Sequence, residues 1–173
     1  MRNFLIAMAL LMAFPLWAKK RELAEDKFIL TGKIYEMDIF NETDKEAGEV
    51  QIVIYQNREI YVSFVGAKGN YEFVLPIGHE YEVWFGGSQY VNKKVYVDAR
   101  PMKKRKSGYE CVIDVGLFKP IANYEFACLI DHYVKVRWDQ EYAQLVPDYE
   151  YCDLKARELQ KAIKRAKKVG GGY

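Results

Sequence analysis

Short runs in which apolar and polar residues alternate follow one another through the middle of this chain. They occupy residues 28–37, 49–57, 59–66, 70–76, 81–85, 90–99 and 109–118, separated by Gly, Asn, Pro or charged residues. A period of two places every second side chain on one face of a β-strand. Because no helical pattern lies between the runs, βαβ units are disfavoured. We expect a mainly β fold, an antiparallel sandwich of about seven strands.

The alternation also predicts which side chains face the interior. The expected inward residues are Val50, Ile52, Ile54, Ile60, Val62, Phe64, Tyr71, Phe73, Leu75, Tyr81, Val83, Phe85, Val95, Val97, Cys111, Ile113 and Val115. Gly32 interrupts the first run where a kink or close packing needs a residue without a side chain. Asn57 and Arg58 indicate a tight hairpin, and the polar segment 40–49 indicates a loop.

The stretch 69–85 reads GNYEFVLPIGHEYEVWF and describes a strand, a corner and a second strand. Pro76 has no N–H to donate, so it ends the first strand. Gly78 tolerates the positive φ that a reversal requires. These two residues are therefore the expected structural turn.

This stretch resembles the carboxypeptidase regulatory-like domain, a transthyretin-like (prealbumin-like) β-sandwich. The residues that match the family pattern are Gly69, Tyr71, Phe73, Leu75, Pro76, Gly78, Tyr81 and Val83. The resemblance covers residues 28–118, and Ala67 departs from it where the family often has a polar turn residue. It implies a transthyretin-like fold for this part of the chain, and it implies no particular function.

The C-terminal third, residues 119–173, reads as an extension of the sandwich. Residues 133–138 and 142–146 predict a short hairpin. Pro147 and Asp148 then indicate the start of a helix over about 148–168. Its apolar face is expected to consist of Cys152, Ala156, Leu159, Ile163 and Ala166.

The N-terminus has the anatomy of a cleavable export signal. Arg2 precedes an apolar run over residues 4–17, and Ala18 precedes charged residues. A span needs roughly 20 apolar residues, which favours a signal peptide (1–18) over an anchor. Residues 19–27 are then a linker, and no span is expected after cleavage. We expect an exported bacterial protein that is periplasmic, associated with the outer membrane, or secreted.

Three cysteines leave at least one thiol unpaired within a monomer. Cys111 lies in a strand-like run and is expected to be a small core residue. Free thiols are the favoured interpretation, and Cys128 with Cys152 is the preferred pair if a disulfide forms. Whether these two pair is left open by the sequence.

Charge is balanced, with 26 Lys and Arg against 24 Asp and Glu and a formal net charge of +2. This disfavours a nucleic-acid partner. Basic residues nevertheless gather in one loop, at Arg100, Lys103, Lys104, Arg105 and Lys106, and again at 161–168. A solvated loop and helix face are the simpler interpretation. The functional alternative is contact with an anionic lipid, a glycan or an acidic protein.

Residues for catalysis are sparse. His79 is expected in an exposed turn, and His132 next to Asp131 does not make a dyad. No serine stands in a Gly-x-Ser-x-Gly elbow, and no Cys/His spacing suits zinc. Transthyretin-like hydrolases end in a Tyr-Arg-Gly-Ser-type tail that this chain lacks. We therefore expect no enzyme activity, cofactor or metal, with such a hydrolase as a remote alternative.

Tyrosines recur in the strand runs, at Tyr55, Tyr61, Tyr90, Tyr96 and Tyr109. Cross-strand packing explains them most simply, and a carbohydrate- or protein-binding sheet face is the alternative. The leading hypothesis is a non-enzymatic exported module that contacts an envelope protein. The second is a carbohydrate- or lipid-binding module that uses the tyrosine face or the 100–106 loop.

Overall fold

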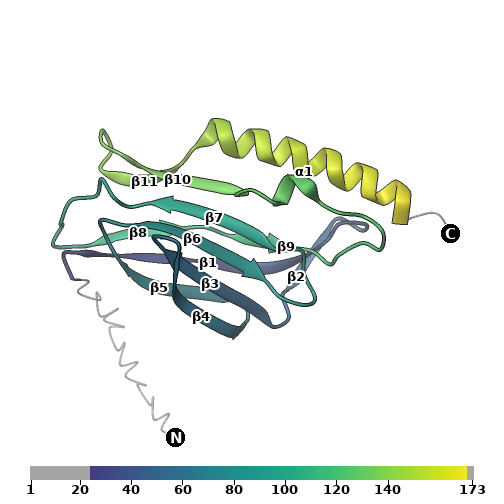
Figure 1. The fold of residues 1–173 in the computed structure, drawn as a ribbon, viewed down its shortest axis with the longest axis horizontal. Helices are drawn as coiled ribbons and strands as arrows, with labels where there is room; N and C mark the ends of the chain where they lie inside the picture. Colours follow the sequence, from purple (N-terminus) through teal and green to yellow (C-terminus); the bar gives the residue numbers. More distant parts are fainter. Residues whose placement is uncertain (1–23, 171–173) are drawn as a thin grey trace, which may run out of the picture.

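The computed structural model describes residues 24–170 (Figure 1). The expected signal peptide (1–18) and most of the expected linker (19–27) lie outside the described residues. Eleven strands precede one long helix. The strands are β1 (Lys27–Asp38), β2 (Thr43–Glu46), β3 (Val50–Gln56), β4 (Glu59–Ala67), β5 (Asn70–Pro76), β6 (Glu80–Gly86), β7 (Lys93–Asp98), β8 (Tyr109–Val112), β9 (Val115–Leu117), β10 (Val134–Asp139) and β11 (Gln144–Pro147). A 3-10 turn, η1 (Ala127–Leu129), and the helix α1 (Tyr149–Gly170) complete the fold.

Two mixed sheets form a sandwich-like, mainly β structure. In the five-stranded sheet, β1 pairs antiparallel with β2 and β5 and parallel with β8 and β9. The six-stranded sheet has the order β11-β10-β7-β6-β3-β4, and β10 lies parallel to β7. The mainly β prediction is confirmed. Two details of the predicted antiparallel sandwich of about seven strands are corrected. β8 and β9 pair parallel with β1, and β10 pairs parallel with β7. The number of strands is larger because β2 is present, the 109–118 run divides into two strands and the C-terminal hairpin joins a sheet.

The interior lies between the sheets, as the alternation predicts for most strands. Val50, Ile52 and Ile54 are fully buried, and Tyr81, Val83 and Phe85 are almost fully buried. They pack in one cluster with β1 side chains that include Phe28, Leu30 and Ile34. Gly32 is needed for close packing: a Cβ at this position would lie 2.6 Å from the carbonyl carbon of Ile113.

The corner after β5 carries the chain from one sheet to the other. Pro76 is the last residue of β5, and Gly78 has φ 87°. The N–H of Gly78 donates to the Ala99 carbonyl at 2.9 Å, and the Tyr81 hydroxyl donates to the Pro76 carbonyl at 2.6 Å. The corner is therefore held from both sides, and His79 beside it is half-buried.

Two sequence predictions fail at the sheet edges. The segment expected to be a loop, 40–49, contains β2, whose four side chains are all exposed and therefore show no alternation. In β4, the expected inward residues Ile60 and Phe64 are instead 65% and 49% exposed. The register of β4 against β3 shifts near Tyr55, and β4 has no partner on its other edge within residues 24–170. A bulged edge strand does not bury one complete face.

The C-terminal hairpin and helix are present as predicted. Asp148 caps α1, since its side chain accepts from the Tyr151 N–H at 3.2 Å. Leu159 and Ala166 face a second core cluster with Phe118, Phe126 and Leu129. In Figure 1 the helix begins beside β10 and continues past η1. Within residues 24–170, no helix is long and apolar enough to cross a membrane.

Candidate binding groove on the six-stranded sheet

A groove of about 510 Å³ opens on the outer face of the six-stranded sheet. We call it the sheet-face groove, and it is lined by Tyr55, Asn57, Arg58, Glu80, Tyr81, Glu82, Trp84, Tyr96 and His132. Strand register explains the assembly. Tyr55 of β3 lies opposite Glu82 of β6, which lies opposite Tyr96 of β7. Residues directly opposite in antiparallel strands share a face, so the three side chains form one row.

Glu82 is the polar centre of this row. Its carboxylate accepts a hydrogen bond from Trp84 Nε1 at 2.5 Å and is hydrogen-bonded through its other oxygen to His132 Nε2. Although burial alone raises the pKa of Glu82, these hydrogen bonds and the imidazole hold it below its usual value. Glu82 is therefore an ionised acceptor at neutral pH.

His132 reaches this carboxylate from the segment that leads into β10. The Tyr151 hydroxyl of α1 donates to the His132 carbonyl at 2.7 Å, so the helix fixes this segment. The His132 ring lies 5.4 Å from the Tyr96 ring. The C-terminal part of the chain thus completes a site whose other residues belong to β3, β6 and β7.

Aromatic rings form the apolar part of the groove. The Tyr55 and Trp84 rings are 5.6 Å apart and tilted by 51°. Lys94, on the next strand, places its Nζ 4.5 Å from the centre of the Trp84 ring. This cation and Glu82 hold the indole from two sides, so its position is set before any ligand binds.

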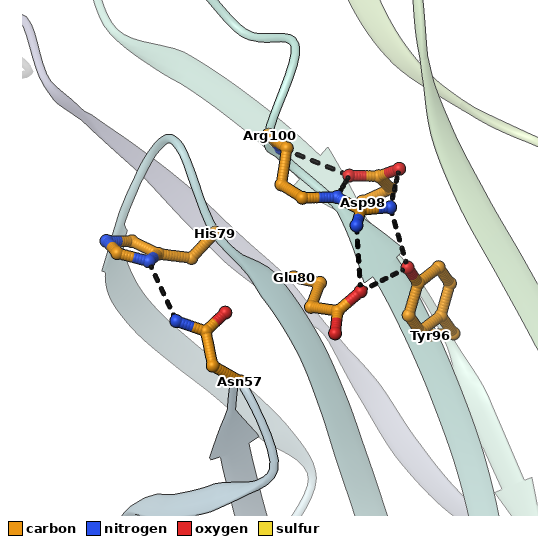
Figure 2. A network of polar contacts seen from close by, with 6 residues as sticks. All are labelled: Asn57, His79, Glu80, Tyr96, Asp98 and Arg100. Atoms are coloured by element: carbon orange, nitrogen blue, oxygen red, sulfur yellow. Dashed lines mark hydrogen bonds and ion pairs between the residues drawn. The ribbon is translucent and has the colours of Figure 1, made fainter.

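A network of charged and polar residues, shown in Figure 2, includes Glu80 and Tyr96 of the groove lining. Glu80 accepts from the Tyr96 hydroxyl at 2.9 Å and pairs with Arg100 at 3.3 Å. Arg100 Nε and Nη2 donate to the two oxygens of Asp98, each at 2.8 Å. The Arg100 guanidinium holds the pKa of Asp98 below its usual range, and burial together with Glu80 raises the pKa of Tyr96 to about 12. The network is fully paired and preorganised.

Beside this network, Asn57 and His79 approach one another at 3.3 Å, between Nδ2 and Nδ1 (Figure 2). Asn57 and Arg58 both have positive φ, 50° and 72°, as the predicted tight hairpin between β3 and β4 requires. The hairpin therefore carries Asn57 and Arg58 to the rim of the groove. His79, expected in an exposed turn, is in contact with this rim.

The basic and tyrosine residues proposed from the sequence as contact sites do not form one site in the structure. Arg100 joins the network at the groove, whereas Lys103, Lys104, Arg105 and Lys106 are exposed on the loop between β7 and β8. Of the five tyrosines, Tyr55 and Tyr96 line the groove. Tyr61 packs against Tyr81, and Tyr109 packs against Trp138. Tyr90 is buried, and its hydroxyl accepts a hydrogen bond from the Gly48 N–H and donates one to Glu36. Aromatic packing therefore accounts for Tyr61 and Tyr109, and Tyr55 and Tyr96 remain candidates for ligand contact.

Sequence reasoning missed Glu82, Trp84 and His132 as a group. One signal was available: Glu80, Glu82 and Trp84 alternate with the buried Tyr81, Val83 and Phe85, so they had to share the outer face. The partnership with His132 had no sequence signal. Asp131, its neighbour, is instead exposed and lies 3.9 Å from Lys155.

The three cysteines are free thiols, and Cys111 is buried as expected. Within residues 24–170, no group of three or more His, Cys, Asp or Glu side chains is placed to hold a metal ion. In the groove, the carboxylates are hydrogen-bonded and flanked by aromatic rings. This arrangement is suited to holding a ligand that has both hydroxyl groups and apolar faces.

The chain is thus a mainly β protein of two sheets, with a groove on the outer face of one sheet. No protein-family model matches the chain, and no curated protein sequence matches it. Among solved structures, catechol 1,2-dioxygenase from Acinetobacter sp. ADP1, in a form inhibited by bound mercury, is a distant match. The TM-score is 0.33 with 12% sequence identity, and the match covers 55% of this chain and 53% of the dioxygenase chain.

Proposed function

We propose that this protein is a non-enzymatic, exported β-sandwich module that binds carbohydrate in the sheet-face groove. The observation that carries the proposal is the row Tyr55–Glu82–Tyr96 with Trp84 beside it, in which aromatic rings alternate with a fixed carboxylate. A sugar ring has apolar C–H faces that stack on aromatic side chains and hydroxyls at its edge that need hydrogen-bond partners. Tyr and Trp are suited to such half-apolar contacts.

Glu82 has capacity left for a ligand. An ionised carboxylate offers about four lone-pair sites. Trp84 and His132 occupy two of them. The remaining sites can accept hydrogen bonds from sugar hydroxyls, and Asn57 and Arg58 at the rim offer donors. Because these groups are already held in position, little conformational entropy is lost when a ligand is ordered against them.

The non-enzymatic part of the proposal is supported by the chemistry of the lining. The imidazole of His132 is engaged by Glu82, and no serine, threonine or cysteine is among the lining residues of this groove. Glu80 and Glu82 are the only lining groups that a glycoside hydrolase could use as acid or nucleophile. Both are held by partners within the protein, Glu82 by Trp84 and His132 and Glu80 by Tyr96 and Arg100, and we therefore propose binding rather than hydrolysis.

The test is an affinity comparison of matched aromatic variants. A glycan array identifies a bound sugar, and its Kd is then measured with Trp84→Ala and with Tyr142→Ala, which removes a 66%-exposed ring from the β10–β11 turn. We expect Trp84→Ala to raise the Kd about tenfold or more, since an aromatic contact contributes roughly 0.5–1.5 kcal/mol beyond the area it buries. Equal Kd values for both variants would place binding elsewhere, and an array without any bound glycan would refute the proposal.

A second candidate function is contact with an envelope protein through β4. This nine-residue strand has an edge that no other described strand covers, and Ile60, Phe64 and Val65 are all exposed along it. Exposed apolar edge strands readily add a further strand. The occupant we propose is an extended strand of a partner protein that adds antiparallel to β4.

The proposals on export and family rest on the sequence. The apolar segment 4–17 supports an exported bacterial protein that is periplasmic, associated with the outer membrane, or secreted. Relationship to the carboxypeptidase regulatory-like domain is supported by the stretch 69–85, which forms β5, the corner and β6. Detection of the processed chain in a periplasmic fraction, with Lys19 as its first residue, tests the first proposal.

A further inference from the structure

The basic loop between β7 and β8 is rigidly held at one end of the molecule. Met102 anchors the loop, since it is buried in the main core cluster. The Tyr109 hydroxyl donates to the Lys103 carbonyl at 2.9 Å, and the Gly108 N–H donates to the Arg105 carbonyl at 2.8 Å. The loop therefore holds a fixed course although Lys103, Lys104, Arg105 and Lys106 are all exposed.

A hydrogen bond joins this loop to the beginning of the described chain. The Arg105 N–H donates to the Glu25 carbonyl at 3.0 Å. The loop is therefore tied both to the core and to the segment just before β1.

The four cations of the loop are not engaged in ion pairs in the part of the chain that the structure describes. Within residues 24–170, none of the four loop side chains forms an ion pair, whereas Arg100 at the loop entrance is neutralised by Asp98 and Glu80. The carboxylates nearest to the loop are Glu25, whose carbonyl accepts from the Arg105 N–H, its neighbour Asp26, and Glu110 of β8. No ion pair within residues 24–170 joins these carboxylates to the loop cations, so the four cations can face a negatively charged surface.

We propose that this end of the protein docks on an anionic lipid bilayer. The cations stand exposed on a loop rather than buried around a pocket, which suits a broad charged surface better than one small anion. Each Lys or Arg near such a surface strengthens binding about fivefold. Removing the four loop cations is therefore expected to weaken binding by roughly 600-fold. This surface is separate from the sheet-face groove.

Vesicle sedimentation tests the proposal with the processed chain. The probes are vesicles of phosphatidylcholine mixed with phosphatidylglycerol, and vesicles of phosphatidylcholine alone. The test variant changes Lys103, Lys104, Arg105 and Lys106 to Gln. The matched control changes Lys161, Lys164, Arg165 and Lys168 to Gln, which removes the same charge from α1. Circular dichroism and thermal melting check that both variants fold.

We expect the unaltered chain to bind the anionic vesicles and not the neutral ones, with affinity that falls as salt is added. The loop variant loses affinity by roughly 600-fold, and the α1 variant keeps its affinity. Equal losses in both variants would overturn the proposal, because binding would then follow net charge alone. Binding of the loop to soluble heparin without binding to anionic vesicles would also overturn it, in favour of an anionic glycan.

Discussion

His132, in the segment that leads into β10, is hydrogen-bonded to Glu82 of β6, fifty residues earlier in the chain. The bond joins the C-terminal hairpin to the centre of the six-stranded sheet and completes the sheet-face groove. Two aromatic rings of the groove contact this pair: Trp84 donates a hydrogen bond to Glu82, and the Tyr96 ring lies against the His132 ring. The stability of the protein and the shape of its groove therefore depend on the same carboxylate.

This carboxylate is expected to make the protein acid-sensitive. The pKa of Glu82 is depressed in the folded state, so its stabilising contribution is present above the ordinary value of 4.5 and is lost as the pH falls below it. Urea unfolding at a series of pH values should show a shallower loss of stability in Glu82→Gln than in the unaltered protein. Some slope remains in the variant, because the pKa values of Glu36, Asp38 and Asp98 are lowered too. Identical slopes would show that Glu82 carries no such linkage.

Lys93 is expected to be a destabilising residue at neutral pH. It is almost completely buried at the start of β7, and burial lowers its pKa from 10.5 to about 8. Aromatic rings compensate in part, with the Tyr133 and Phe118 centroids 4.4 Å and 5.4 Å from Nζ. Because the unfolded state binds the proton more tightly, stability should rise between pH 8 and 10.5.

Lys93→Met removes the cost of burying this charge while it keeps a similar shape. We expect the free energy of unfolding at pH 7 to increase by roughly 2 kcal/mol and the rise above pH 8 to disappear. Lys94→Met, one residue along on the opposite face, is the control and should bring no such gain. A Lys93→Met protein that is less stable than the parent would mean that the ammonium group has a favourable role that burial does not reveal.

The contrast between Lys93 and Val50 shows how far the sequence predicts this fold. Where a strand has neighbours on both sides, alternation alone identifies the buried face, as for Val50, Ile52 and Ile54. Lys93 occupies an inward position that its charge argues against, and only the tertiary packing of Phe118 and Tyr133 explains its burial. The short polar strand β2 and the bulged edge strand β4 are mispredicted for a related reason, because neither buries a whole face.

The site was less predictable than the fold. Alternation along β6 predicts that Glu80, Glu82 and Trp84 share the outer face of the sheet. It does not predict that Tyr55 of β3 and Tyr96 of β7 lie on either side of Glu82, which depends on the strand order. His132 enters only because β10 pairs parallel to β7, a long-range pairing that no local pattern in residues 119–147 indicates. Sequence reasoning therefore found the tyrosines and missed the carboxylate–imidazole pair between them.

Gly32 should be irreplaceable, because β1 passes so close to the Ile113 backbone. Gly32→Ala is expected to destabilise the protein by about 3 kcal/mol or to prevent folding, since neither backbone can yield without breaking the pairing of β1 with β8. Gly48→Ala is the comparison, because its nearest contact would be the Tyr90 hydroxyl at 3.2 Å. Thermal melting measures both. Equal melting temperatures would show that the Gly32 contact relaxes freely.

The exposed edge of β4 predicts self-association at high protein concentration when the proposed partner strand is absent. Val65→Lys should abolish it, because a charge on an edge strand opposes further pairing. Val112→Lys is the matched control, since Val112 of β8 is 65% exposed and Val65 is 67% exposed. Sedimentation velocity at rising concentration provides the measurement. Association that survives Val65→Lys, or that Val112→Lys abolishes equally, would exclude β4 as the interface.

Chemical-shift mapping with mixtures of mono- and disaccharides tests the central claim most directly, because the experiment works before the bound sugar has been identified. In a 15N-labelled sample of the processed chain, the account predicts that a bound sugar shifts the Trp84 indole Nε1–H resonance and the amides of Tyr55, Glu82 and Tyr96, whose side chains line the groove. The indole of Trp138, which packs against Tyr109 outside the groove, should not move. Shifts that gather away from these residues, or no shifts with any sugar, would contradict the assignment of the sheet-face groove as a carbohydrate site.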